Sequence, residues 1–254
     1  MMHFLHLLFH EVRLLFIAPA TYIAATLFLV LMGIIYLLGI DAVSSGPQEN
    51  LPSDLFFQLF WIPVFFMVPL LTMKSIAEER RLGTLETLLS TPPGSLQIVL
   101  SKFFAAYLLY LLCWALTLCF PLIVYFSLPS ARVDARLLDP ASLLGGYSFI
   151  AISGTLFIAL GLFSSSLTRS TLVAGMLSFS LLFVIILGGR LLLEQPFMEV
   201  GWLQWMDDPI DYLHAFRHLD YFSRGVIDTR PFFFYLSNAL LLLGITSLVV
   251  ESKA

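Results

Sequence analysis

The sequence has 254 residues, of which 59% are hydrophobic and only 12% are Asp, Glu, Lys or Arg, and its formal net charge is −4. Soluble domains usually carry about 25% charged residues, so this composition excludes a disordered chain, a collagen, a coiled coil and a disulfide scaffold, and it argues against a water-soluble globule. The small negative charge offers no basic surface for nucleic acid. The composition therefore predicts a polytopic protein of the lipid bilayer.

Residues 1–13 are predicted to form an amphipathic elbow helix that lies in the membrane interface and leads into the first span. Its apolar face comprises Phe4, Leu5, Leu8, Phe9 and Val12. Its opposite face carries His3, His6 and His10. A three-histidine metal site is the alternative, but zinc ligands usually converge from several directions and have a second shell of partners. The apolar run that follows is too long for a cleavable signal peptide, so none is expected.

Six stretches without Asp, Glu, Lys or Arg are long enough to cross a bilayer: 14–40, 55–73, 103–131, 140–168, 170–189 and 231–250. About 20 apolar residues in a helix cross the hydrocarbon layer, and a helix satisfies its backbone polar groups internally. These runs are continuous rather than alternating, which excludes a barrel. The sequence therefore predicts an all-α integral membrane protein that forms one transmembrane domain over 1–254.

The even number of spans places both termini on one side of the membrane. If that side is the cytoplasm, all three lysines lie inside, and the first outer loop, 41–54, has no basic residue. This distribution agrees with the positive-inside rule, so we expect both termini to be cytoplasmic.

Cys113 and Cys119 lie six residues apart in one apolar run. On a helix, this spacing does not allow a disulfide between them.

The segment 74–102 combines dense charge with helix breakers. Its charged residues Glu78, Glu79, Arg80 and Arg81 are predicted to form a turn after the second span. Gly83 then breaks the helix, and Thr84 is expected to cap a short amphipathic helix with Glu86 near its positive end. Residues 91–94, Thr-Pro-Pro-Gly, end that helix, and Ser95 is expected to cap the next one. A plain connector needs only about two to eight residues, so this segment indicates a cytoplasmic docking surface.

Two segments of the sequence resemble a known family. Residues 78–92, EERRLGTLETLLSTP, followed by IVLSKF at 98–103, resemble the cytoplasmic signature of ABC-2 type transporter permeases. A second block, HLDYFSRGVIDTR at 218–230, is similar to the segment before the last span in the gliding-motility-associated and copper-maturation branches of that family. The resemblance implies a six-span permease subunit of the bacterial cytoplasmic (inner) membrane.

The resemblance also implies partners and a role for the 74–102 segment. Its short helix would be the coupling helix, which binds in a groove of a separate ABC ATPase subunit. By motif, the residues that form or brace this contact are Glu78, Glu79, Arg80, Arg81, Gly83, Thr84 and Glu86. Two ATPase copies would bind the ATP and Mg²⁺, and a second permease subunit, identical or related, would complete the pathway. A periplasmic accessory protein is a further possible partner, and no cofactor is expected on this chain itself.

The segment 190–230 is too polar for a span and too apolar for a free loop. Asp207-Asp208-Pro209 is a predicted helix start, and that helix is expected to end near Gly225, before Asp228 or Thr229 caps the last span with Pro231 in its first turn. The resemblance implies an outer gate here, with Asp208, Pro209, His218, Gly225 and Asp228. Asp211, His214 and His218 share one helix face, where a metal site is the alternative to a solvated polar face.

The span 140–168 is rich in small residues. They are Gly145, Gly146, Ser153, Gly154, Gly161 and Ser164–Ser166. Small residues let membrane helices approach closely, and packing within the chain is favoured over a subunit interface.

Several function classes lack the residues that they need. No segment matches G-x-x-x-x-G-K-[ST] or G-x-S-x-G, so neither ATP binding in a P-loop nor a serine hydrolase of that form is expected. The predicted spans hold no ionisable carboxylate or base, which argues against ion-coupled transport. The favoured function is an ATP-driven exporter subunit for an amphipathic or lipid-like cargo. The alternatives are a membrane anchor for mechanical or assembly work on a periplasmic partner, and an intramembrane enzyme, for which no reactive constellation is found.

Overall fold

The computed structural model describes residues 2–44, 56–89, 94–127, 140–193, 215–223 and 229–253, and within these ranges it contains helices and no strand. The helices are α1 (Met2–Ile17), α2 (Pro19–Ser44), α4 (Trp61–Thr72), α5 (Ala77–Leu82), α6 (Thr84–Leu89), α7 (Ser95–Thr117), α8 (Cys119–Ser127), α9 (Pro140–Leu167), α10 (Thr171–Leu193), α12 (Ala215–Ser223) and α13 (Thr229–Ser252). Six stretches within the described ranges are long and apolar enough to cross a membrane, which confirms the all-α fold with six spans.

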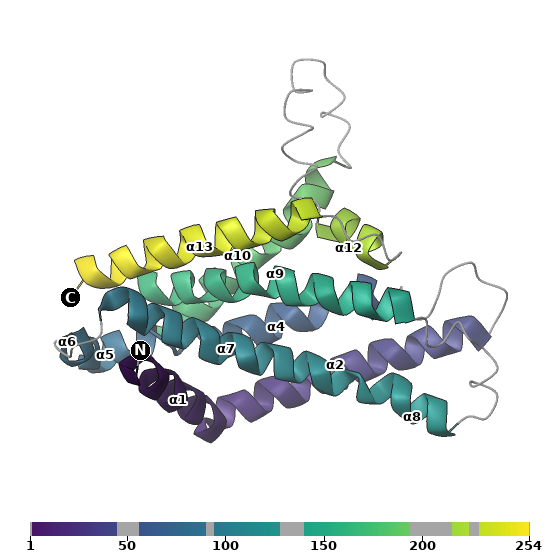
Figure 1. Ribbon diagram of the computed structural model, residues 1–254, viewed down its shortest axis with the longest axis horizontal. Helices are drawn as coiled ribbons and strands as arrows, with labels where there is room; N and C mark the ends of the chain where they lie inside the picture. The colour runs from purple at the N-terminus through teal and green to yellow at the C-terminus, as the bar shows by residue number, and fades with distance from the viewer. Residues whose placement is uncertain are drawn as a thin grey trace, which may run out of the picture.

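The first span begins later than predicted. The helix α1 continues to Ile17, and a new helix starts at Pro19. Proline has no backbone N–H and fits the first turn of a helix, so it favours a break at Ala18. The helix α1 then packs along α7 (Figure 1), where the Phe4 and Phe104 rings meet edge to face.

The third span begins earlier than predicted, because α7 starts at Ser95 and includes Lys102. The prediction ended each apolar run at the first charged residue. A helix continues through such a residue when its charge is paired inside the protein. The helix breaks at Leu118, where α7 ends and α8 begins, although the membrane-capable stretch continues to Val124. The helix α10 runs on to Leu193, but its membrane-capable stretch, Thr171–Gly188, agrees with the predicted fifth span.

The small-residue helix α9 lies at the centre of the bundle and packs against α4, α7, α10, α12 and α13. A Cβ atom added at Gly154 would lie 2.3 Å from the Tyr110 ring, and one at Gly161 would lie 2.3 Å from Thr72 Oγ1. The glycines therefore bring neighbouring helices of the same chain together, which confirms the prediction of intramolecular packing. Cys113 is buried, Cys119 is exposed, and both are free thiols.

One end of the bundle gathers the start of α1, the pair α5–α6 and the end of α13 (Figure 1). The opposite end carries α8, α12 and the far end of α2. The two ends of the chain thus lie at the same end of the bundle. Ser95 is not the cap of α7, as predicted, because Gly94 occupies the cap position and Ser95 is the first helical residue. The Ser95 hydroxyl instead donates a hydrogen bond to Glu251 at the end of α13.

Candidate functional site: a braced helix pair at one end of the bundle

The charged residues after the second span form the helix α5, not the predicted turn. Glu78 and Glu79 lie in its first turn, and Arg80 and Arg81 lie in its last turn. This order places negative charge at the positive end of the helix dipole and positive charge at the negative end, which stabilises even a short helix.

Gly83 ends α5 in the left-handed conformation, with φ of 71°. Its N–H donates to the carbonyl oxygen of Glu79, as in a helix cap of the αL type. The predicted break at this position is confirmed. Thr84 was expected to cap α6, but its hydroxyl donates to the same Glu79 carbonyl at 3.3 Å. Thr84 therefore stabilises the end of α5, and α6 begins with Thr84 itself.

The start of α5 is held by a serine from α9. The backbone N–H groups of Ile76 and Ala77 donate to Ser165 Oγ at 3.1 and 3.0 Å, and this hydroxyl donates to the carbonyl of Met73 at 3.2 Å. The first N–H groups of a helix have no partner within that helix. Ser165 supplies the missing acceptor from a distant part of the chain and joins α5 to α9.

A second link between α5 and α9 comes from Arg80. Its Nη1 atom donates to the carbonyl oxygen of Ser166 at 2.6 Å. This carbonyl belongs to the last turn of α9, where carbonyl groups lack helical partners and a positive charge is favourable. The end of α9 is thus fixed against α5 by one charged and one neutral side chain.

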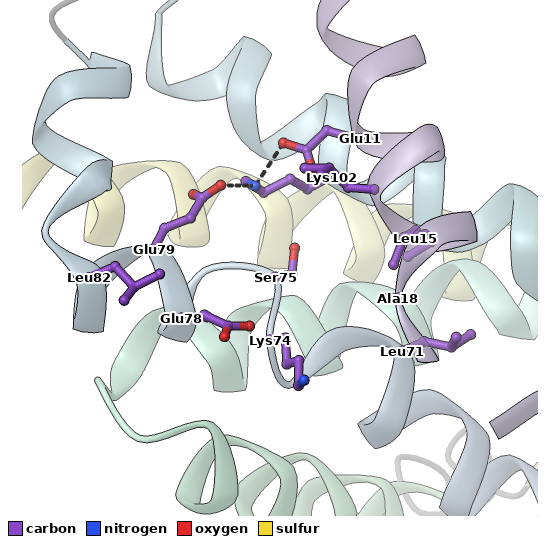
Figure 2. Close-up of a pocket in the computed structure, with 12 residues that line it drawn as sticks. Glu11, Leu15, Ala18, Leu71, Lys74, Ser75, Glu78, Glu79, Leu82 and Lys102 are labelled. Atoms are coloured by element: carbon purple, nitrogen blue, oxygen red, sulfur yellow. Dashed lines mark hydrogen bonds and ion pairs between the residues drawn. The ribbon is translucent and has the colours of Figure 1, made fainter. Parts of the chain in front are cut away.

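A buried ion triad joins α5 to two further helices. The Lys102 Nζ atom, on α7, donates to Glu11 Oε1 on α1 at 2.8 Å and to Glu79 Oε1 on α5 at 2.5 Å (Figure 2). Lys102 is only 3% exposed and Glu11 only 8% exposed. Burying charges is unfavourable unless they are paired and hydrogen-bonded, and here one ammonium group pairs with two carboxylates.

This triad was not predicted from the sequence. The prediction that the spans hold no ionisable carboxylate or base is wrong for the third span, because Lys102 lies roughly 10 Å along α7 from its start. The sequence of α1 does contain an indication of a buried ion pair. Glu11 shares a helix face with Phe4, Leu8 and Leu15 at a helical spacing, and an acidic residue on an apolar face needs a buried cation nearby.

The predicted coupling residues fall into two groups. Glu79 and Arg80 point inward and attach α5 to α7 and α9. Glu78 and Arg81 pair with each other at 3.2 Å on the outside, where the Arg81 side chain is 57% exposed. The outer surface continues through Leu82, Gly83, Thr84 and Glu86, all exposed, whereas Leu85 is buried and holds α6 against the bundle.

The predicted outer gate is described only in part. Asp208, Pro209, Gly225 and Asp228 lie outside the described residues, as do Asp211 and His214 of the metal hypothesis. In α12, Leu219 and Phe222 are buried, and this helix packs on α9. His218 is 9% exposed, and its Nδ1 atom lies 3.5 Å from the Tyr235 hydroxyl on α13. His218 therefore packs between helices.

The three N-terminal histidines of the other metal hypothesis are also described only in part. The side chain of His3 lies outside the described part, while His6 and His10 are exposed. Among the described residues, no group of three or more His, Cys, Asp or Glu side chains is placed to hold a metal ion.

These features define a multi-pass helical membrane protein with a short helix pair braced against the end of its bundle. A family model described as "ABC-2 family transporter protein" matches residues 16–250. The chain therefore belongs to the ABC-2 family of transporter proteins, as the resemblance of its two motifs implied. It is a membrane-spanning permease subunit, and membership implies a partner ABC ATPase in general. A comparison with curated proteins found no match.

Proposed function

We propose that this chain is the permease half of an ATP-driven exporter in the bacterial cytoplasmic membrane, with the α5–α6 end and both termini in the cytoplasm. A separate ATPase subunit, in two copies, binds ATP and Mg²⁺ and contacts the exposed surface of α5–α6. A second permease subunit completes the pathway. The observation that carries this proposal is the bracing of α5: its outer side is exposed, while its inner side is bonded to α9 and α7 and is linked through Lys102 to α1.

The bracing gives a physical route from a motor to the spans. An ATPase that moves α5–α6 also pulls on the end of α9 through Ser165 and Arg80, and on α7 and α1 through Lys102. Hydrogen bonds that involve a charged group are about twice as strong as neutral ones. Besides α5, the helix α9 packs against α4, α7, α10, α12 and α13, so displacement of its end reaches most of the bundle.

The cargo follows from where charge is buried. In the described residues, the Asp, Glu, Lys and Arg side chains that are buried are Glu11 and Lys102, both at the α5 end. The remaining core is apolar and aromatic, with Phe60, Trp114, Phe157 and Tyr235 among its buried side chains. Such a core suits an amphipathic or lipid-like cargo better than a bare ion, for which charged or polar side chains line the path.

The central test compares two neighbouring arginines. Arg81→Glu is expected to lower stimulation of the co-purified ATPase about tenfold, because a reversed charge on a contact surface costs more than 1.4 kcal/mol, while thermal stability stays close to that of the wild type. Arg80→Glu is expected to lower both the ATPase stimulation and the thermal stability, because it also breaks the hydrogen bond to the Ser166 carbonyl. The measurements are ATPase rates in reconstituted vesicles and thermal unfolding of the permease.

Arg230→Glu is the matched control, since Arg230 is exposed and lies in the first turn of α13, and it is the other end of this helix that approaches α5–α6 (Figure 1). Full ATPase stimulation and normal co-purification in Arg81→Glu would contradict the proposed contact. If vesicles move no cargo but a periplasmic protein changes the ATPase rate, the anchor function applies instead of export.

The bend between α5 and α6 gives a second test. Gly83→Val is expected to lower ATPase stimulation about fivefold to tenfold, because a non-glycine residue at positive φ costs about 1–2 kcal/mol and a β-branched residue fits this conformation worst. An added Cβ meets no atom within 4 Å there, so the fold is retained. Gly83→Asn is the control, since asparagine tolerates the left-handed conformation. Equal stimulation in both variants would show that the bend is not required.

A further inference from the structure

A pocket of about 380 Å³ lies between α1, α4, α5 and α7, beside the ion triad (Figure 2). One part of its lining is charged, with Glu11, Glu79 and Lys102 joined by Lys74 and Glu78. The rest is apolar, with Leu14, Leu15, Ala18, Leu71 and Ala106 among its residues. The pocket thus has the two-part character of an amphipathic ligand.

Glu79 defines what the charged part recognises. Its Oε1 atom accepts the hydrogen bond from Lys102, but its Oε2 atom is buried and receives no hydrogen bond from any residue that the structure describes. A buried carboxylate oxygen needs a donor. Lys102 already serves two carboxylates, so the fitting ligand brings its own N–H groups and a positive charge.

The mouth of the pocket defines the rest of the ligand. Two of its exposed lining residues, Leu14 and Leu82, are apolar and are 47% and 65% exposed. A water-soluble amine gains little from these two leucines, whereas an acyl chain buries apolar surface against them. Lys74 lines the same pocket and offers a cation for a phosphate next to the ammonium group.

We propose that this pocket binds a bilayer phospholipid with an ethanolamine headgroup. Its ammonium group donates to Glu79 Oε2, its phosphate pairs with Lys74, and an acyl chain lies along Leu14, Leu15 and Leu71. The lipid would fill the space between the N-terminal helix and α5. The pocket shares Glu78 and Leu82 with the outer surface of α5–α6, but the groups that bind the headgroup lie inside it, and lipid binding there requires no ATPase.

The test measures lipid binding to the purified permease alone, by native mass spectrometry with phosphatidylethanolamine and phosphatidylcholine of identical chains. Phosphatidylcholine has the same phosphate but no N–H donor. We expect phosphatidylethanolamine to bind at least tenfold more tightly, as a charge-assisted hydrogen bond implies. In Glu79→Gln the amide oxygen still accepts from Lys102, but the NH₂ group replaces Oε2, so the preference is expected to fall to about twofold or less.

A second variant guards against misfolding of the first. Ala106→Phe projects a ring into the pocket and is expected to reduce binding of both lipids about tenfold, whereas Leu108→Phe on the exposed side of α7 leaves binding unchanged. Equal affinity of the wild type for the two lipids, or unchanged binding in Ala106→Phe, would overturn the proposal. Equally tight binding of glycerophosphoethanolamine, which has no acyl chain, would also overturn it in favour of a soluble amine. No outcome depends on ATPase contact, so failure here is distinct from failure of the exporter proposal.

Discussion

Replacing Lys102 with methionine is expected to destabilise the permease by about 3–5 kcal/mol, the range for removal of one partner from a buried ion pair. The variant leaves Glu11 and Glu79 side by side without their shared cation. Thermal or denaturant unfolding in detergent measures the loss. Lys253→Met is the control, because Lys253 is exposed and donates only a 3.4 Å hydrogen bond to the Leu167 carbonyl.

The triple variant Glu11→Gln, Lys102→Met, Glu79→Gln separates folding from coupling. With all three charges removed, most of the lost stability is expected to return, because no buried charge is left unpaired. If the triad transmits movement from α5 to α7 and α1, ATPase stimulation by the stable triple variant stays at least fivefold below that of the wild type. A Lys102→Met variant as stable as Lys253→Met would show that the triad does not hold the fold.

Substitution of Gly145 by alanine is the second large effect that we expect. A Cβ atom there would lie 1.8 Å from the carbonyl oxygen of Phe222, so α12 has to move away from α9. Backbone cannot yield as a flexible side chain does, and overpacking typically costs about 1–3 kcal/mol. We expect the loss of stability to lie in at least the upper part of that range, and we expect Leu219 and Phe222 to become exposed.

Thermal unfolding of three glycine variants tests this expectation. Gly154→Ala, which meets the Tyr110 ring at 2.3 Å, is expected to be less harmful than Gly145→Ala, because a ring can shift. Gly244→Ala, on α13 with no atom within 4 Å of the new Cβ, is expected to be neutral or slightly stabilising, since alanine has the higher helix propensity. A Gly145→Ala variant as stable as Gly244→Ala would contradict the close approach of α12 and α9.

The buried hydroxyl and charged groups explain why α5 forms at all. Six residues of isolated helix are far too short to be stable in water. Ser165 caps its start, Arg80 binds the end of α9, and Glu79 binds Lys102. The element that faces the proposed ATPase therefore owes its structure to the spans behind it, which is the arrangement that a mechanical link requires.

The sequence by itself determined the features that depend on local chemistry. Uninterrupted apolar runs predicted six spans because lipid accepts only helices of sufficient length. Gly83 predicted a break because glycine readily adopts positive φ, and the motif at residues 78–92 pointed to the family that the match over 16–250 established. The small residues of the fourth span predicted close packing, although not which helices would meet them.

Only the tertiary structure decided which charges are buried and what they hold. Glu11 and Lys102 are 91 residues apart in the chain, and Ser165 lies 88 residues from Ala77. No local pattern specifies such partners. A charged residue in the sequence predicts the end of a span. It becomes part of the span only when folding brings a residue of opposite charge next to it. For that reason the limits of the third span and the division of α5 into an inner and an outer side depended on the folded chain.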